Sequence, residues 1–351
     1  MSSTLEHVHE LNPFERNIRE QSDALRALLD AGADPRLTAI AKRPWERVVL
    51  TGMGSSHFAG LPTWRALVEA GVSAWNVDAG QLLDTPGIIT PETLVIATSQ
   101  SGASGEVVEL IDRAAAGRLQ WGALVGIAAA QESPLSNAAD LYLPLHSGDE
   151  ATVSTKSYLN SLAVHRRVAA AFGSTQEAAV ETQIAEAANR IEPLLALDTT
   201  LLARDALAHA RPRLATVGWG DDAATAQYAA LIIKEASKVA IEGFVGGAFR
   251  HGPYELAGPG LTAVLFGASA DDADGPLARI AGDLLESGAA VVLVGDLELD
   301  GATTLPTSVG GTLEALAAQS VVAESLAVAV ARANGVDPGA FAYGSKVTVK
   351  L

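Results

Sequence analysis

The sequence contains no cysteine among its 351 residues. This absence excludes disulfide bonds, thiolate metal sites, iron–sulfur ligation and a cysteine nucleophile. His7 and His9 stand near the N-terminus without a second cluster of ligating side chains, so we expect no metal site. A chain that forms no disulfides suits a reducing compartment, and we expect a cytoplasmic protein.

Basic residues and long apolar runs are also scarce. The 24 lysines and arginines are outnumbered by 41 aspartates and glutamates, which gives a formal net charge of −17. A field of this sign repels nucleic acids and anionic membrane surfaces, so we expect neither as a partner. The most apolar helical stretch, residues 313–333, is interrupted by Glu314, Gln319 and Glu324 and does not reach the roughly 20 apolar residues of a membrane helix. A basic, apolar secretory signal is not visible at the start.

Short apolar runs that alternate with helical patterns dominate the rest of the chain. Fully apolar strands between helices are typical of a parallel sheet covered on both faces, so we predict an α/β fold. A strand, a Gly-x-Gly turn and a helix occur near residues 48–54 and again near residues 214–220, which indicates two copies of one unit. The predicted division is a helical lead-in (1–34), a first module (35–170), a helical linker (171–197), a second module (198–335) and a tail (336–351).

The sharpest local motif is SQSGASGE at residues 99–106. It follows an apolar strand pattern (93–98) and opens a helix, so it lies where parallel sheets bind ligands. Its hydroxyls, its glycine and the free N–H groups of a helix start suit an anion. The alternative is an ordinary serine-rich turn in which Ser101 or Ser104 caps the helix.

A glycine-rich turn, GMGSSH at residues 52–57, follows the first predicted strand. It lacks the third glycine of a dinucleotide fingerprint, and no acidic residue stands in the expected place about 20 residues further on. We therefore expect no nucleotide cofactor here. The turn is either a tight strand-to-helix connection or a second wall of the same crevice, with Ser55 and Ser56 facing the SQSGAS motif.

A third candidate cluster runs from Lys234 to Pro253. Glu235 stands among apolar residues, so partial burial would raise its pKa and suit it to act as a base. Glu242 would share a face with it if the predicted helix 223–239 persisted. His251 precedes Gly-Pro, a turn that could aim its imidazole. Lone glutamates and histidines are more often solvated or structural.

Two further sets of charged residues do not by themselves indicate a functional site. Lys346 lies in the tail segment YGSKVTV, where most lysines are solvated. The pairs Asp149-Glu150 and Asp221-Asp222 are interpreted as loop acids.

Taken together, five motifs resemble the sugar isomerase (SIS) domain family. They are GMGSS (52–56), SQSGAS (99–104), STK (154–156), KE…HGP (234–253) and SKVTV (345–349). Within that family the chain is most similar to the isomerase half of glutamine–fructose-6-phosphate aminotransferase and to stand-alone glucosamine-6-phosphate deaminases and deglycases. The resemblance covers nearly the whole chain and implies two SIS modules, each a five-stranded parallel sheet flanked by helices in a flavodoxin-like three-layer sandwich.

The resemblance also implies roles for individual residues. The sugar phosphate would be bound by Ser99, Gln100, Ser101 and Ser104, and the sugar would be lined by Ser55, Ser56 and Thr152. Glu235 would move a proton between sugar carbons 1 and 2. His251 would open the ring, reaching the site from a neighbouring subunit, and Lys346 would contact the open-chain sugar. We therefore expect a homodimer with shared active sites, and the alanine-rich segment 313–333 offers an apolar face for packing.

Three departures from the family pattern bear on function. The aminotransferase needs a cysteine nucleophile to hydrolyse glutamine, and this chain has none. The second module carries FGASA (266–270) where an SQSG-like turn would stand, so we expect one phosphate site per chain. Ala342 occupies the place of a family arginine, which alters the tail contact.

The predicted function is a cofactor-independent aldose–ketose isomerase or amino-sugar-phosphate deaminase acting on a glucosamine 6-phosphate-like substrate. Three alternatives remain open: a deglycase of phosphorylated fructose–amine adducts, an isomerase of a sulfonated sugar, and a non-catalytic sugar-phosphate sensor. The sensor is the least favoured, because no DNA-binding segment is visible in the first 42 residues and the net charge is strongly negative.

Overall fold

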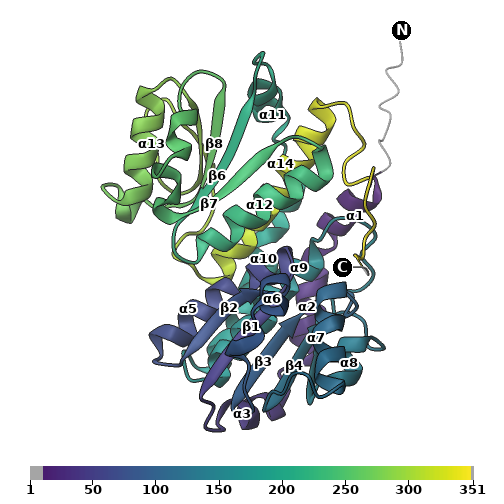
Figure 1. Ribbon diagram of the computed structural model, residues 1–351. Coiled ribbons are helices and arrows are strands. Elements are labelled where there is room, and N and C mark those ends of the chain that lie inside the picture. The colour runs from purple at the N-terminus through teal and green to yellow at the C-terminus, as the bar shows by residue number, and fades with distance from the viewer. Residues whose placement is uncertain (1–10, 349–351) are drawn as a thin grey trace.

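Two five-stranded parallel sheets form the frame of the protein. The structure is a computed structural model that describes residues 11–348. The first sheet contains β1 (Arg47–Gly52), β2 (Ala74–Asp78), β3 (Thr93–Thr98), β4 (Ala123–Ala128) and β5 (Leu141–Pro144). The second contains β6 (Arg213–Gly218), β7 (Ile241–Val245), β8 (Leu261–Ala268), β9 (Ala290–Gly295) and β10 (Thr303–Pro306). The predicted fold class is confirmed (Figure 1).

The two sheets share one topology. The strand order is β2-β1-β3-β4-β5 in the first sheet and, in the corresponding sense, β7-β6-β8-β9-β10 in the second. The central strands β1, β3 and β4 are almost wholly buried, as expected for a parallel sheet with helices on both faces. The sheets lie within the predicted modules 35–170 and 198–335, whose exact boundaries remain predictions.

Helices cover both faces of each sheet and fill the junction between them. Short 3-10 helices are labelled η. Before the first sheet and between its strands, the helices are α1 (Pro13–Arg19), α2 (Gln21–Ala31), α3 (Pro35–Ala41), α4 (Ser55–Ala59), α5 (Leu61–Glu69), α6 (Ala79–Asp84), η1 (Pro86–Ile88), α7 (Gly105–Ala115) and α8 (Pro134–Ala138). The rest are α9 (Lys156–Ala171), α10 (Glu177–Ile191), η2 (Glu192–Ala196), α11 (Thr200–Leu207), α12 (Asp222–Ser237), η3 (Gly246–Arg250), η4 (Pro253–Leu256), η5 (Ala270–Asp272), α13 (Pro276–Glu286) and α14 (Leu313–Ala333).

Helix α14 forms the buried centre of the molecule, next to α12 (Figure 1). It is long and apolar enough to cross a membrane by length and composition, but 83% of its apolar window is buried inside the fold, as in a core helix. The expectation that this segment offers a face for dimer packing is therefore wrong, because its apolar side chains already pack within their own chain.

The region after Glu235 corrects a second expectation. Helix α12 ends at Ser237, and Lys238 adopts a left-handed conformation (φ 62°) that turns the chain into β7. Glu242 thus lies on a strand at the sheet edge, exposed to solvent, and does not share a helix face with Glu235.

Candidate active site

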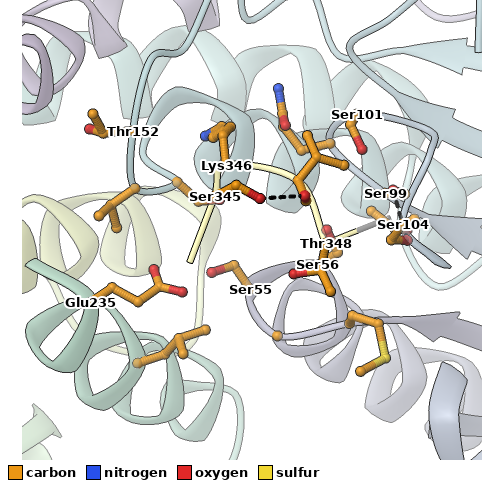
Figure 2. Close-up of a pocket in the computed structure, with 18 of the residues that line it drawn as sticks. Ser55, Ser56, Ser99, Ser101, Ser104, Thr152, Glu235, Ser345, Lys346 and Thr348 are labelled. Atoms are coloured by element: carbon orange, nitrogen blue, oxygen red, sulfur yellow. Dashed lines mark hydrogen bonds between the residues drawn. The ribbon is translucent and has the colours of Figure 1, made fainter. Parts of the chain in front are cut away.

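A cavity of about 280 Å³ opens at the carboxyl ends of β1 and β3. The first module contributes the turns after both strands and the loop before α9. The second module contributes the last turns of α12, and the C-terminal tail crosses the opening (Figure 2). Nine of the predicted site residues line the cavity: Ser55, Ser56, Ser99, Gln100, Ser101, Ser104, Thr152, Glu235 and Lys346.

The turn after β3 presents several hydroxyl groups on a tight backbone. The hydroxyls of Ser99 and Ser104 lie 3.1 Å apart, and Ser101 Oγ accepts a hydrogen bond from the Ala103 N–H at 3.2 Å. Gly102 has φ 64°, and a Cβ there would lie 2.1 Å from Ser133 Oγ, so only glycine fits. Ser104 occupies the N-cap position of α7 but makes no side-chain capping bond, which leaves its hydroxyl available to a ligand.

The C-terminal tail lies directly over this turn. The Gly105 N–H at the start of α7 donates a hydrogen bond of 2.9 Å to the carbonyl of Thr348. The Ser345 hydroxyl donates to the carbonyl of Val347 at 2.8 Å, so the tail makes a turn at these residues (Figure 2). Residues 336–348 contain neither helix nor strand, as the sequence predicts for the described part of the tail.

Glu235 enters the cavity from the second module. Figure 2 shows its carboxyl group pointing from α12 toward Ser55 of the first module. Burial raises the pKa of Glu235, against the opposing effect of Lys346 and of Lys238 and Lys234. The predicted partial burial and raised pKa are confirmed, and both suit a carboxylate that acts as a proton acceptor.

Glu150 is a member of the site that the sequence analysis missed. Its side chain is fully buried and lies 2.7 Å from Lys346 Nζ. It also accepts hydrogen bonds from the N–H and hydroxyl groups of Thr155 (2.8 and 3.1 Å) and of Ser157 (3.0 and 2.6 Å). Burial acts to raise the pKa of Glu150, but Lys346 and the Ser157 donors hold it below its usual value.

The Glu150–Lys346 pair overturns two interpretations. Glu150 is not a solvated loop acid, and the Lys346 side chain is four-fifths buried. The only sequence signal for this pair is the run of hydroxyl-bearing residues after Glu150, at positions 152, 154, 155 and 157. Together the two residues fix the ammonium group at the cavity wall.

His251 does not line the cavity of its own chain. It follows η3 in the second module and is exposed, next to Gly252 with φ 113°. The Thr152 hydroxyl does line the cavity, and within residues 11–348 it is buried without a hydrogen-bond partner. An unpaired buried hydroxyl at a cavity wall suits a group that bonds a ligand.

No group of three or more His, Cys, Asp or Glu side chains that could hold a metal ion is present among residues 11–348. His7 and His9 lie outside the residues that the structure describes.

Residues 43–171, which hold the first sheet and its serine-rich turns, match the SIS domain family. The chain contains a SIS domain. Glutamine–fructose-6-phosphate aminotransferase of Aeropyrum pernix is 30% identical over 314 residues, which is 83% of this chain and 49% of that protein. The aminotransferase of Zymomonas mobilis is 30% identical over 222 residues, 60% of this chain and 36% of that protein. The chain thus spans half or less of the length of these relatives.

Solved structures extend the likeness beyond the matched SIS domain to both sheets. The C-terminal domain of glucosamine-fructose-6-phosphate aminotransferase from Francisella tularensis has a TM-score of 0.82 at 18% identity and covers 95% of this chain and 99% of its own. Glucosamine-6-phosphate deaminase from Thermotoga maritima has a TM-score of 0.75 at 19% identity, with 96% and 99% covered. At these identities the likeness establishes the fold, and both modules share it.

Proposed function

We propose that the protein is a sugar-phosphate aldose–ketose isomerase or amino-sugar-phosphate deaminase with a glucosamine 6-phosphate-like substrate. The observation that carries the proposal is the pairing of Glu235 with the serine-rich turn across one cavity. A carboxylate with a raised pKa faces an anion cradle, as proton transfer on a tethered phosphosugar requires.

The cradle at Ser99, Ser101 and Ser104 holds the phosphate and leaves carbons 1 and 2 near Glu235. The phosphate does not react, so the free energy of its binding can serve to orient carbons 1 and 2 for proton transfer. We further propose that His251 of a second subunit assists ring opening, because it is exposed and does not line its own chain's cavity.

Glu235 then takes the proton from carbon 2 and returns it to carbon 1. With a hydroxyl on carbon 2 the product is a ketose. With an amino group on carbon 2 the same shift gives an imine, which water hydrolyses to the ketose and ammonia. The Lys346 ammonium, held by Glu150, stabilises negative charge on the open-chain oxygen.

A substrate panel tests this proposal. The protein is incubated with glucose 6-phosphate, glucosamine 6-phosphate, a 6-phosphofructosyl amino acid and sulfoquinovose, and ketose, ammonia and free amino acid are followed together. Ketose alone indicates an isomerase, and ketose with ammonia a deaminase. If no sugar on the panel is converted and none binds, the proposal fails.

One observation favours the deglycase as a second candidate. A neighbouring cavity adjoins the first across Gln100 and is lined by Glu20, Asp149, Glu150 and Lys156. Acidic and basic side chains next to the sugar cavity suit the amino-acid part of a fructose–amine adduct. Release of an amino acid from the 6-phosphofructosyl substrate, with no turnover of glucosamine 6-phosphate, would select this function.

A further inference from the structure

The internal repeat builds a second cleft that nothing so far accounts for. The first cavity joins the turn after β1 to the end of α12, and a second cleft joins the turn after β6 to the end of α5. Glu235 follows Gly218, the last residue of β6, by seventeen residues, and Glu69 follows Gly52, the last residue of β1, by the same number. Each carboxylate lines the cleft of the opposite module.

The third wall of each cleft corresponds as well. Residues 152–154, just before α9, line the first cavity, and residues 310–312, just before α14, line the second cleft. The second cleft has a volume of about 660 Å³, which accommodates a small-molecule ligand. Exchange of the two modules therefore relates three walls of the first cavity to three walls of the second cleft. The turn after β3 and the tail have no counterpart among the residues that line the second cleft.

The charges in the second cleft differ from those of the first. The serine cradle has no counterpart here, because the turn after β8 does not line this cleft and the sequence FGASA (266–270) replaces the SQSG motif. Asp221 lies between two guanidinium groups, 2.9 Å from Arg65 Nε and 3.5 Å from Arg166 Nη2. Since these cations are already paired with a carboxylate, the cleft does not favour a phosphate.

Other groups in the cleft are free to meet a ligand. Arg166 Nε is buried, and within the described residues it has no hydrogen-bond partner. The Trp219 side chain lines the cleft and is 41% exposed. One part of its indole ring packs on the β7–η3 turn, since a Cβ on Gly246 or Gly247 would lie 3.6 Å from it. The remaining surface of the ring is an apolar platform surrounded by donors and acceptors.

We propose that this second cleft binds an uncharged, polyhydroxylated ring the size of a monosaccharide. The apolar face of the ring would stack on Trp219. Its hydroxyl groups would donate to the carboxylates of Asp221 and Asp222 and accept from Arg166 Nε. Two guanidinium groups, those of Arg65 and Arg166, stand beside three carboxylates in the lining, so hydroxyls find both donors and acceptors there and an anion is not attracted. The proposal does not depend on the function assigned to the first cavity.

Binding of glucose, fructose and N-acetylglucosamine to the full chain tests the proposal, by saturation-transfer NMR and calorimetry. At least one sugar should bind in the millimolar range, and Trp219→Leu should weaken it by about fivefold or more. Trp219→Phe, which keeps an aromatic platform, should retain most of the affinity. Trp75 is a matched control, because it is 40% exposed on the edge strand β2, and Trp75→Leu should leave binding unchanged.

Two results would overturn the proposal. One is the absence of binding by all three sugars to a folded protein. The other is binding that survives Trp219→Leu but disappears when Ser101 and Ser104 are both replaced by alanine, because the sugar would then occupy the first cavity.

Discussion

Glu235 and Lys346 are the two charged side chains that reach the cavity at the ends of β1 and β3 from outside the first module. One comes from a helix of the second module and the other from the tail, yet both lie against the same serine-rich turns. Partial burial raises the pKa of Glu235. Lys346 forms an ion pair with the buried carboxylate of Glu150.

Glu235→Gln should lower kcat by about 10²–10⁴ while the substrate dissociation constant changes little, because a positioned base is lost and the cradle is untouched. Steady-state kinetics and calorimetry measure the two quantities. In the parent protein, activity should fall on the acid side at a pH above the ordinary glutamate range, since the pKa of Glu235 is raised. Glu242→Gln is the control, because that carboxylate is exposed on β7. Near-normal turnover in Glu235→Gln would show that Glu235 is not the catalytic base.

Lys346→Met should lower both activity and stability, because it leaves the buried Glu150 carboxylate without its cation. Adding Glu150→Gln should recover stability relative to Lys346→Met alone, with a coupling of at least about 1 kcal/mol, and should not recover activity. Chemical denaturation of the two single variants and the double variant measures the coupling. Additive effects would show that the two side chains act independently.

The turn between β3 and α7 is the element on which the cradle depends. Its backbone doubles back through Gly102 in a left-handed conformation and packs against Ser133 of the α8 cap. The motif was visible in the sequence because a strand, a glycine turn and a helix start are all local features. Local patterns did not indicate what the turn would face, since Glu235 lies more than a hundred residues further along the chain, and only the family resemblance placed the two in one site.

Gly102→Ala should destabilise the protein by roughly 1–3 kcal/mol and raise KM, since a Cβ at φ 64° is strained and meets Ser133. Urea unfolding and substrate kinetics measure both effects. Gly87→Ala is the control, because nothing lies within 4 Å of the added Cβ. Equal effects of the two substitutions would contradict the steric argument.

At the scale of the whole molecule, the proposed shared active site can be tested by mixing two inactive variants. Glu235→Gln and His251→Ala chains are unfolded together and refolded at equal concentration. If each site takes Glu235 from one subunit and His251 from its partner, heterodimers contain one intact site, and roughly a quarter of the parent activity should return. If His251 serves its own chain, or if the protein is a monomer by light scattering, no activity returns.

A second whole-molecule prediction concerns the buried centre. Burial raises the pKa of Glu324 on α14 to about 8. Its carboxyl group lies 2.7 Å from the Tyr228 hydroxyl on α12, which also lies 2.8 Å from the Ser154 carbonyl. Tyr228 has a single proton to donate and two acceptors beside it. A protonated Glu324 therefore completes a series of hydrogen bonds from the core to Ser154, which lines the cavity at the ends of β1 and β3.

The folded protein therefore holds a proton on Glu324 that the unfolded chain releases above about pH 4.5. The free energy of unfolding should fall as pH rises from about 5 toward 8. Glu324→Gln, which cannot titrate, should show a flatter dependence in denaturation curves measured across this range. Equal slopes for the parent and the variant would place the pH dependence elsewhere.

Strands β2, β7 and β10, which no apolar run in the sequence marks, all lie at sheet edges. Edge strands are partly exposed and carry polar residues, as in the sequences AWNVD and TTLP, so they lack the apolar run that marks a central strand. The end of α12 was misplaced for a related reason. Lys238 has no special preference for the left-handed conformation it adopts, so nothing in the local sequence indicates the turn into β7.

The sequence by itself determined the α/β class, the internal repeat and the serine-rich turn, because these follow from local patterns. The family resemblance supplied nine of the residues that line the cavity. Only the tertiary structure decided which acids are solvated and which are buried. Glu150 became a partner of Lys346, Glu324 a buried acid and Asp221 a bridge between Arg65 and Arg166, each through contacts between distant segments. Burial and charge pairing are properties of packing, so they cannot be read from the neighbours of a residue along the chain.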